Sequence, residues 1–337
     1  MNNFKRIGII MGDAAGIGPE IIIKTLTDKK MDLSNTKIVV IGSFNIMSLM
    51  NDILGRPAEL IRTNENLTEK YECGKIQIFD YEVEKNNSFK WGVPDAINGK
   101  NTIEYIRKGI DLATNGNLDG IVFAPFNKES MHMAGSKHPD EFSLMKEITG
   151  IKTLKGVVKW NNIFRSSVVG HVAFKDIISN LNQQNIVTTV EYLGKTIESF
   201  LDSEIRIGVA GLNPHAGDGG AFGDEEEKIL IPAIEECKIR FPYLMSGPFP
   251  ADTVLVRAIR KQLDGIVYLY HDQGNIAMKS AAFGEGVLIY PGMPFCITNP
   301  GHGTAYGRAG KGYANYNNFA QSLQACIEIC RKGSWNF

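Results

Sequence analysis

Short β-branched runs alternate with longer helical patterns along the whole chain of 337 residues. The runs lie at residues 7–10, 37–41, 120–123, 167–169, 205–209 and 265–270. In the segments between them, such as residues 102–113, apolar side chains recur every three or four positions, which is the spacing of a helix. Strands that alternate with helices pair in parallel, because each connection returns across the sheet as a helix. The sequence therefore predicts an α/β fold with mostly parallel sheets that are covered by helices.

The chain is long enough for two domains of about 150 residues each. We expect a boundary near residues 125–130, which follow the third β-branched run. Residues 1–127 would then form the first domain and residues 128–304 the second. The final segment, residues 305–337, ends in a helical pattern and is expected to return to the first domain.

The charge balance excludes several classes of protein. The chain has 36 Lys and Arg against 37 Asp and Glu, a formal net charge of −1, so bulk charge would not hold nucleic acid or an anionic membrane. No apolar run approaches the ~18 residues of a membrane span, and Asp13 interrupts the N-terminal apolar stretch before it reaches the length of a secretory signal. The five cysteines are scattered without a C-x-x-C pair, so we expect free thiols and a cytoplasmic location.

Three of the six histidines follow expected strands: His171, His215 and His271. Ligands of open parallel sheets bind outside the carboxyl ends of the strands, so these three side chains have a place to converge. Neutral imidazoles suit a divalent metal that keeps one position open for substrate. The alternative is three unrelated loop histidines.

The loops around these histidines carry further polar groups. Residues 213–223 (NPHAGDGGAFG) are rich in glycine, which permits close approach of a ligand to the backbone, while the acidic run that follows would suit a helix dipole. Residues 270–274 (YHDQG) place the Asp272 carboxylate beside an imidazole, and Lys279 follows. The segment 247–253 (GPFPADT) presents Asp252, for which a helix cap is the alternative role.

Two glycine-rich segments lie near the ends of the chain, at residues 12–20 (GDAAGIGPE) and 301–315 (GHGTAYGRAGKGYAN). Neither contains G-x-G-x-x-G, and the chain has no Walker A pattern, which disfavours a Rossmann dinucleotide site and a P-loop NTPase. Each segment taken alone is also compatible with a tight structural turn.

Taken together, these motifs resemble known dehydrogenases. The segments 12–20 and 302–315 look like the two signature ends of the isopropylmalate and isocitrate dehydrogenase superfamily. The more specific motifs at 213–217, 247–253 and 270–274 resemble the 4-hydroxythreonine-4-phosphate dehydrogenase family of vitamin B6 biosynthesis. They cover nearly the whole chain in the order found in that family.

The resemblance implies two α/β/α domains and a homodimer with each active site at the dimer interface. It implies NAD or NADP as oxidant, and a divalent metal held by His171, His215 and His271 across the two subunits. Imidazole ligands favour zinc, with cobalt, nickel, iron and manganese as alternatives. The implied reaction is metal-assisted oxidation of a secondary alcohol, followed by loss of the neighbouring carboxylate as CO2.

The resemblance also assigns roles to individual residues. Asp252 and Asp272 fall on the active-site acids, and Lys279 falls on the substrate-binding lysine. Which of these three groups relays the proton stays open. His138 matches the substrate-binding histidine through a loose alignment. The cofactor segment comprises Gly301, His302, Gly303, Thr304 and Asn315.

Three positions depart from the family pattern. Pro139 replaces a threonine, Leu288 an asparagine and Ile297 an arginine, and a lost guanidinium is a lost bidentate clamp for an anion. We therefore also expect a paralogue that acts on another small hydroxy acid, such as 4-phospho-threonate or 4-phospho-erythronate; other relatives oxidise a cis-dihydrodiol dicarboxylate. A phosphate acyltransferase-like enzyme without redox chemistry shares the broad fold, and a metal-dependent lyase or hydrolase is the third alternative.

Overall fold

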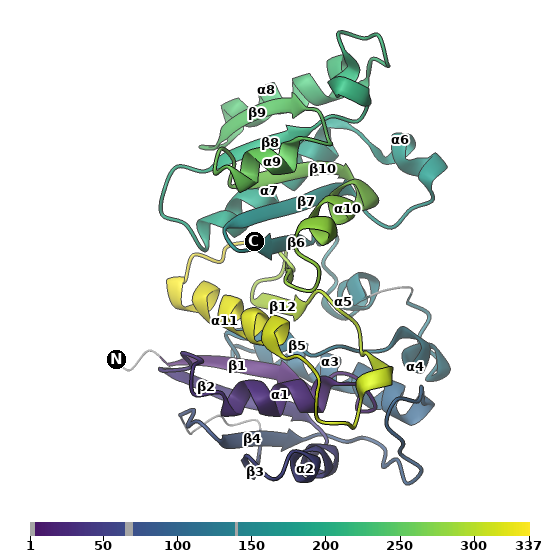
Figure 1. Ribbon diagram of the computed structural model, residues 1–337, viewed down its shortest axis with the longest axis vertical. Coiled ribbons are helices and arrows are strands. Elements are labelled where there is room, and N and C mark those ends of the chain that lie inside the picture. The colour runs from purple at the N-terminus through teal and green to yellow at the C-terminus, as the bar shows by residue number, and fades with distance from the viewer. Residues whose placement is uncertain (1–3, 65–69, 139–140) are drawn as a thin grey trace. The chain divides into compact units, whose positions relative to one another are not determined.

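The computed structural model describes residues 4–64, 70–138 and 141–337 and divides into two compact units (Figure 1). Unit 1 contains residues 1–154 and 293–333, and unit 2 contains residues 155–292 and 334–337. In unit 1 the elements are β1 (Lys5–Ile10), α1 (Gly18–Thr27), β2 (Thr36–Gly42), α2 (Phe44–Ile53), β3 (Glu59–Thr63), β4 (Lys75–Asp80), α3 (Ala96–Thr114), β5 (Gly120–Phe123), α4 (Lys128–Met133), α5 (Glu141–Thr149), β12 (Cys296–Pro300), η4 (Tyr306–Arg308) and α11 (Asn317–Lys332).

The strands of unit 1 pair in the order β3-β4-β2-β1-β5-β12, and every pair is parallel. The central strands β1, β2 and β5 are almost entirely buried, which explains their continuous apolar sequences. Helices α1 and α11 pack together on one face of the sheet and α3 packs on the other (Figure 1). The predicted α/β fold is confirmed.

In unit 2 the elements are β6 (Val157–Trp160), β7 (Ile163–Val169), η1 (Phe174–Asp176), α6 (Ile177–Asn180), α7 (Gln183–Glu198), β8 (Arg206–Ala210), η2 (Pro214–Gly217), η3 (Glu226–Leu230), α8 (Ile231–Arg240), β9 (Leu244–Phe249), α9 (Val254–Ile259), β10 (Gly265–Tyr270), α10 (His271–Ala281) and β11 (Val287–Ile289). The strands pair in the order β11-β6-β7-β10-β8-β9. The pairs that involve β6 are antiparallel, and β7, β10, β8 and β9 run parallel.

Helices cover both faces of the sheet of unit 2. Helices α7 and α8 pack on one face, and α9 and α10 pack on the other (Figure 1). Under α9 and α10 lies an apolar cluster in which Tyr268 of β10, Val254 of α9 and Met278 of α10 are all buried. This packing fixes α10 against β7 and β10, where two of the predicted metal ligands emerge.

The units divide at other positions than the sequence predicts. Unit 1 continues to residue 154 instead of ending at 127, and the chain returns to it at residue 293 instead of 305. The physical reason is packing: α4 and α5 lie against α3, and β12 pairs with β5. The pairing of β12 with β5 joins segments far apart in the sequence, so no local pattern marks the return to unit 1.

The cysteines of the chain are all free thiols, as predicted. Cys296 of β12 and Cys326 and Cys330 of α11 are buried together in unit 1. A Cβ atom on Gly120 of β5 would lie 2.6 Å from Cys326 Sγ and 2.8 Å from Cys330 Sγ, so α11 packs directly on bare backbone. Within residues 4–64, 70–138 and 141–337, no helix has the length and apolarity needed to cross a bilayer.

Candidate functional site

Adjacent parallel strands bring two of the predicted metal ligands together in unit 2. Strand β10 pairs with β7 through Tyr270 and Val169, so the carboxyl ends of both strands lie at one edge of the sheet. His171 follows β7 by two residues and His271 begins α10 directly after β10. Their ring centroids lie 4.6 Å apart with an angle of 50° between the ring planes.

Both ring nitrogens of His271 have partners. Nδ1 lies 2.6 Å from Oδ1 of Asp272, whose side chain is exposed. Nε2 lies 2.7 Å from Nδ2 of Asn275, one turn further along α10. A carboxylate on the second nitrogen is the arrangement that orients histidine ligands in metal sites, and it gives Asp272 a role beside the imidazole.

His215 lies in unit 2 on a strained loop. His215, Ala216 and Asp218 have φ angles of 53°, 57° and 44°, in the left-handed region that costs a residue with a Cβ about 1–3 kcal/mol. The buried carboxylate of Glu226 holds this loop: its Oε1 accepts from the backbone N–H groups of Leu212 and Asn213, both at 2.8 Å. Its Oε2 accepts from Asn213 Nδ2, also at 2.8 Å. Glu226 therefore clamps the loop, whereas the sequence suggested only a helix-dipole role for this acidic run.

The histidine side chains supply some, but not all, of the ligands that a metal ion needs. The rings of His171 and His271 lie close enough together to serve one ion, and imidazole nitrogen suits zinc and its neighbours in the transition series. Among the described residues, however, no group of three His, Cys, Asp or Glu side chains is placed to hold a metal. Two ligands are one fewer than a catalytic zinc site takes from protein.

Asp252 and Lys279, the other predicted active-site groups of unit 2, are exposed. Neither makes a hydrogen bond or ion pair with the part of the chain that the structure describes. Thr253 is the N-cap residue of α9, so the alternative role of Asp252 as a helix cap is not observed. Lys279 lies eight residues beyond His271 on α10, roughly 12 Å along the helix axis.

The two glycine-rich segments pack against each other in unit 1. Ile17 N donates to the carbonyl of Thr304 at 3.0 Å, and a Cβ atom on Gly16 would lie 2.9 Å from Thr304 Cβ. Glu20, which is fully buried, accepts from Gly312 N at 3.2 Å and from the Lys24 ammonium at 2.6 Å. The motif 12–20 thus anchors the motif 301–315.

Asp13, inside the first of these motifs, is a buried carboxylate to which the sequence assigned no role. It is fully buried and accepts from Ala15 N at 2.8 Å and from Tyr306 Oη at 2.9 Å. The Tyr306 hydroxyl also lies 3.1 Å from Ser130 Oγ. Burial raises the pKa of Asp13, and the hydrogen bonds from Ser130 and Tyr306 oppose that shift. In the sequence, the position of Asp13 between Gly12 and Gly16 was the feature that could have pointed to a structural role for this carboxylate.

The outer part of the segment 301–315 leaves its backbone open. Gly301 and Gly303 are exposed, and a Cβ atom on Gly303 would meet nothing within 4 Å. His302 Nδ1 lies 3.0 Å from the carbonyl of Gly303, while Thr304 is buried against α1. The Asn315 side chain accepts from Asn317 N at 2.9 Å and so serves the start of α11. An open, glycine-rich backbone of this kind fits a nucleotide that approaches closely.

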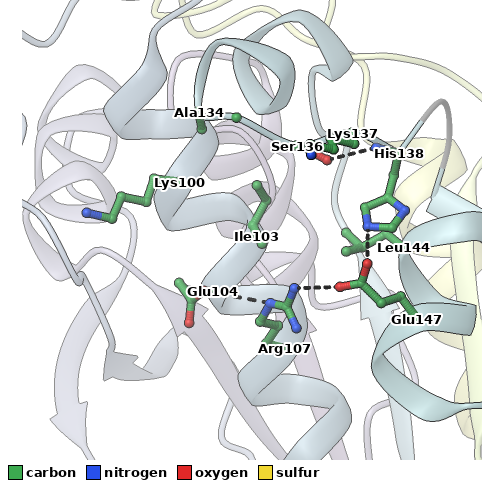
Figure 2. Close-up of a pocket in the computed structure, with 11 residues that line it drawn as sticks. Lys100, Ile103, Glu104, Arg107, Ala134, Ser136, Lys137, His138, Leu144 and Glu147 are labelled. Atoms are coloured by element: carbon green, nitrogen blue, oxygen red, sulfur yellow. Dashed lines mark hydrogen bonds and ion pairs between the residues drawn. The ribbon is translucent and has the colours of Figure 1, made fainter.

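Unit 1 also contains a cavity of about 330 Å³ beside His138 (Figure 2). Its lining comprises Lys100, Ile103, Glu104, Arg107, Ala134, Gly135, Ser136, Lys137, His138, Leu144 and Glu147. Glu147 of α5 bridges Arg107 Nη2 at 3.1 Å and His138 Nε2 at 2.8 Å. The hydrogen bond from Arg107 is the main cause that lowers the pKa of Glu147. The cavity therefore carries basic groups from α3 and from the loop before α5.

The three departures from the family pattern lie in different surroundings. Ile297 is fully buried in β12, where it pairs with Ile121 of β5. Leu288 is half-buried on β11 of unit 2. Pro139 lies outside the described residues. At position 297 an arginine would therefore bring a charge into the core of unit 1.

Comparison with known proteins gives one consistent result. The model of the family described as pyridoxal phosphate biosynthetic protein PdxA matches residues 34–326. The D-threonate 4-phosphate dehydrogenase of Pectobacterium atrosepticum is 35% identical over 326 residues, or 96% of this chain and 99% of that protein. The 4-hydroxythreonine-4-phosphate dehydrogenase of Desulforapulum autotrophicum is 34% identical over 324 residues, or 96% and 94%. A crystal structure of 4-hydroxythreonine-4-phosphate dehydrogenase from Klebsiella pneumoniae matches with a TM-score of 0.85 at 32% identity and covers 97% of this chain and 98% of that one.

All three relatives are dehydrogenases, and the chain shares their fold over almost its full length. It is therefore an oxidoreductase that acts on a CH–OH group. Within that class, the chain belongs to the family of the pyridoxal phosphate biosynthetic protein PdxA. The resemblance to 4-hydroxythreonine-4-phosphate dehydrogenases that the sequence motifs indicated is confirmed.

Proposed function

We propose that the chain is an NAD- or NADP-linked dehydrogenase of a phosphorylated four-carbon hydroxy acid, with D-threonate 4-phosphate as the first candidate substrate. Oxidation of the C3 hydroxyl would transfer hydride to the nicotinamide and yield a β-keto acid, which then loses its carboxylate as CO2. The observation that carries this choice is the 35% identity to the D-threonate 4-phosphate dehydrogenase of Pectobacterium atrosepticum over 96% of this chain. Ile297, where the resemblance to the biosynthetic family implies an arginine, is buried and apolar, which disfavours the biosynthetic substrate.

The metal site of the proposal starts from His171 and His271, whose rings lie 4.6 Å apart. We infer that His215 from a second copy of the chain completes it, because the described residues of one copy contain the His171–His271 pair but no group of three possible ligands. Zinc suits these ligands best, with cobalt, nickel, iron or manganese as alternatives. A divalent ion held there would supply Lewis acidity toward the substrate oxygen.

Exposed groups of unit 2 would transfer the protons of the reaction. Asp252 and Lys279 have no partner within the described part of the chain, which leaves them available to a ligand. Asp272 holds His271, so we assign the proton relay to Asp252 or Lys279. Lys279 of α10 and His138, which lines the cavity of unit 1, are the proposed substrate-binding side chains.

The cofactor would bind at the segment 301–315, through Gly301, His302, Gly303, Thr304 and Asn315. The exposed backbone at Gly301 and Gly303 supports this assignment, because a dinucleotide approaches glycine more closely than any other residue. Hydrogen bonds from Gly312 N to Glu20 and from Ile17 N to the carbonyl of Thr304 anchor the segment, which is therefore preorganised for a ligand.

We further propose a homodimer with the site at its interface. Large apolar side chains of unit 2 are exposed beside the histidine pair: Phe174 is 80% exposed and Ile276 is 68% exposed. Phe174 follows His171 by three residues, and Ile276 lies on α10 five residues after His271. Exposed apolar groups next to an incomplete ligand set are the expected marks of a surface that a partner covers. Free cysteines support a cytoplasmic location.

A reduction assay with NAD and with NADP tests the proposed reaction. The metal-loaded protein would be given D-threonate 4-phosphate, D-erythronate 4-phosphate, 4-hydroxythreonine 4-phosphate and unphosphorylated D-threonate. We expect D-threonate 4-phosphate or D-erythronate 4-phosphate to be oxidised with much higher kcat/KM than 4-hydroxythreonine 4-phosphate. Faster turnover of 4-hydroxythreonine 4-phosphate would restore the biosynthetic reaction instead.

Elemental analysis tests the proposed metal site. The wild-type protein should bind close to one transition metal ion per subunit, and His215→Ala should lose most of it. Light scattering on the same samples should show a dimer. A wild-type protein that binds no metal after reconstitution, or a fully active monomer, would contradict this part of the proposal.

A further inference from the structure

Arg165 is a buried cation to which the proposed reaction gives no role. It lies on β7 and is only 7% exposed. It forms no ion pair with any carboxylate among the described residues, and its Nε atom has no hydrogen-bond partner. Burial lowers its pKa to about 10. A buried charge without a counterion is unfavourable unless its remaining donors are well used.

The donors that Arg165 does use lead to the histidine pair. Arg165 Nη2 donates to Oδ1 of Asn275 on α10, and Nη1 lies 3.4 Å from Ser167 Oγ. Asn275 Nδ2 lies 2.7 Å from His271 Nε2. His271 Nδ1 lies 2.6 Å from Asp272 Oδ1. A continuous chain of hydrogen bonds therefore runs from the buried guanidinium to the exposed carboxylate.

The chemistry of each group fixes the direction of these hydrogen bonds. A guanidinium has only donors, so the Asn275 atom that faces Arg165 is its oxygen. The Asn275 atom that faces His271 is then the amide nitrogen, which donates, and Nε2 must accept. A carboxylate only accepts, so the proton of the imidazole is on Nδ1. The hydrogen bond from Asn275 and the hydrogen bond to Asp272 therefore require the same tautomer of His271.

We propose that Arg165 is a positioning residue which, through Asn275, holds His271 in the Nδ1–H tautomer with an unprotonated Nε2. Nε2 is then the nitrogen available to a metal ion in place of the Asn275 amide, because a metal ligand must offer a lone pair. This consequence rests on the proposed function, whereas the tautomer itself does not. Without the guanidinium, the Asn275 amide is free to rotate and present oxygen to Nε2, which would favour the other tautomer.

Two substitutions separate this role from simple packing. Arg165→Met keeps an unbranched side chain in the core but removes the donor that orients Asn275. Asn275→Asp has nearly the same shape and gains an ion pair with Arg165, so folding should be retained. The new carboxylate can only accept from His271. Arg260→Met, an exposed arginine of the same unit, is the matched control.

The tautomer can be read directly by NMR on the full-length protein. The chain has six histidines, so 15N-histidine labelling gives few signals, and His271→Gln assigns the one of interest. Two-bond 1H–15N correlation spectra of metal-free protein would be recorded where imidazole is neutral. We expect His271 to carry its proton on Nδ1 in the wild type and in Arg260→Met. Arg165→Met should show both tautomers, and Asn275→Asp should place a proton on Nε2.

A wild-type His271 with its proton on Nε2 would overturn the proposal. So would an Asn275→Asp protein that folds and still carries the proton on Nδ1 alone. If Arg165→Met does not fold, the Asn275→Asp protein decides the question by itself. The spectra need no metal, so they give their answer whether or not the metal analysis of His215→Ala supports the proposed site.

Discussion

Replacement of Glu226 by glutamine should loosen the loop that carries His215. The carboxylate is 2% exposed, and its Oε1 already accepts two backbone N–H groups at 2.8 Å. In Glu226→Gln the remaining oxygen must stay on those two donors, so the new amide nitrogen faces Asn213 Nδ2, which is also a donor. One charge-assisted hydrogen bond is then lost, which is worth about 1.5–3 kcal/mol. His215 and its strained neighbours lose the clamp that maintains their conformation.

Hydrogen exchange measured by mass spectrometry follows this change locally. The peptide that covers residues 211–218 should exchange roughly 10- to 150-fold faster in Glu226→Gln, which is the same free energy at 1.4 kcal/mol per decade. Glu227→Gln, an exposed carboxylate next in the chain, is the control and should leave the exchange unchanged. Equal exchange in wild type and Glu226→Gln would refute the clamp.

Three further changes test other parts of the structure. Burial raises the pKa of Asp13 above the ordinary value of a carboxyl, which is ~4. Ionisation of Asp13 at higher pH therefore destabilises the folded wild type, and the stability of Asp13→Asn relative to wild type should rise between pH ~4 and pH ~8 in thermal unfolding. A difference that stays constant with pH would contradict this prediction. His302→Ala should raise the KM for NAD or NADP more than it lowers the metal content, whereas equal cofactor affinity would place the cofactor elsewhere. Gly120→Ala would set a Cβ 2.6 Å from Cys326 Sγ, and this overpacking should cost about 1–3 kcal/mol in denaturant unfolding, a loss that an unchanged midpoint would exclude.

Strand prediction from the sequence succeeded where strands are buried on both faces. The six expected runs overlap strands β1, β2, β5, β7, β8 and β10, because strands that are buried on both faces need apolar stretches of several residues. The strands that the sequence did not show are short, or half-exposed with mixed polarity. β3, for example, has no fully buried residue, and β12 ends in a proline. Pairing with a neighbour makes these segments strands, and the neighbour is distant in the sequence.

The meeting of two of the predicted metal ligands was also foreseeable from the sequence. His171 and His271 each follow a strand, and parallel strands deliver their carboxyl ends to one edge of a sheet. The sequence did not show that β7 and β10 are neighbours, which brings the two rings to 4.6 Å. Nor did it show that His215 stays outside this pair in a single chain.

Other groups of the site were set by tertiary structure alone. The sequence shows a carboxylate at Glu226 and an arginine at Arg165, but not that both are buried. Burial decides what they do: Glu226 turns back to the loop at residues 212–213, and Arg165 reaches Asn275 across 110 residues of chain. A charged group takes its role from the partners left to it once water is removed. Those partners are fixed by how strands and helices pack. The sequence alone therefore determined which kinds of chemical group are available, and the tertiary structure decided which of these groups meet.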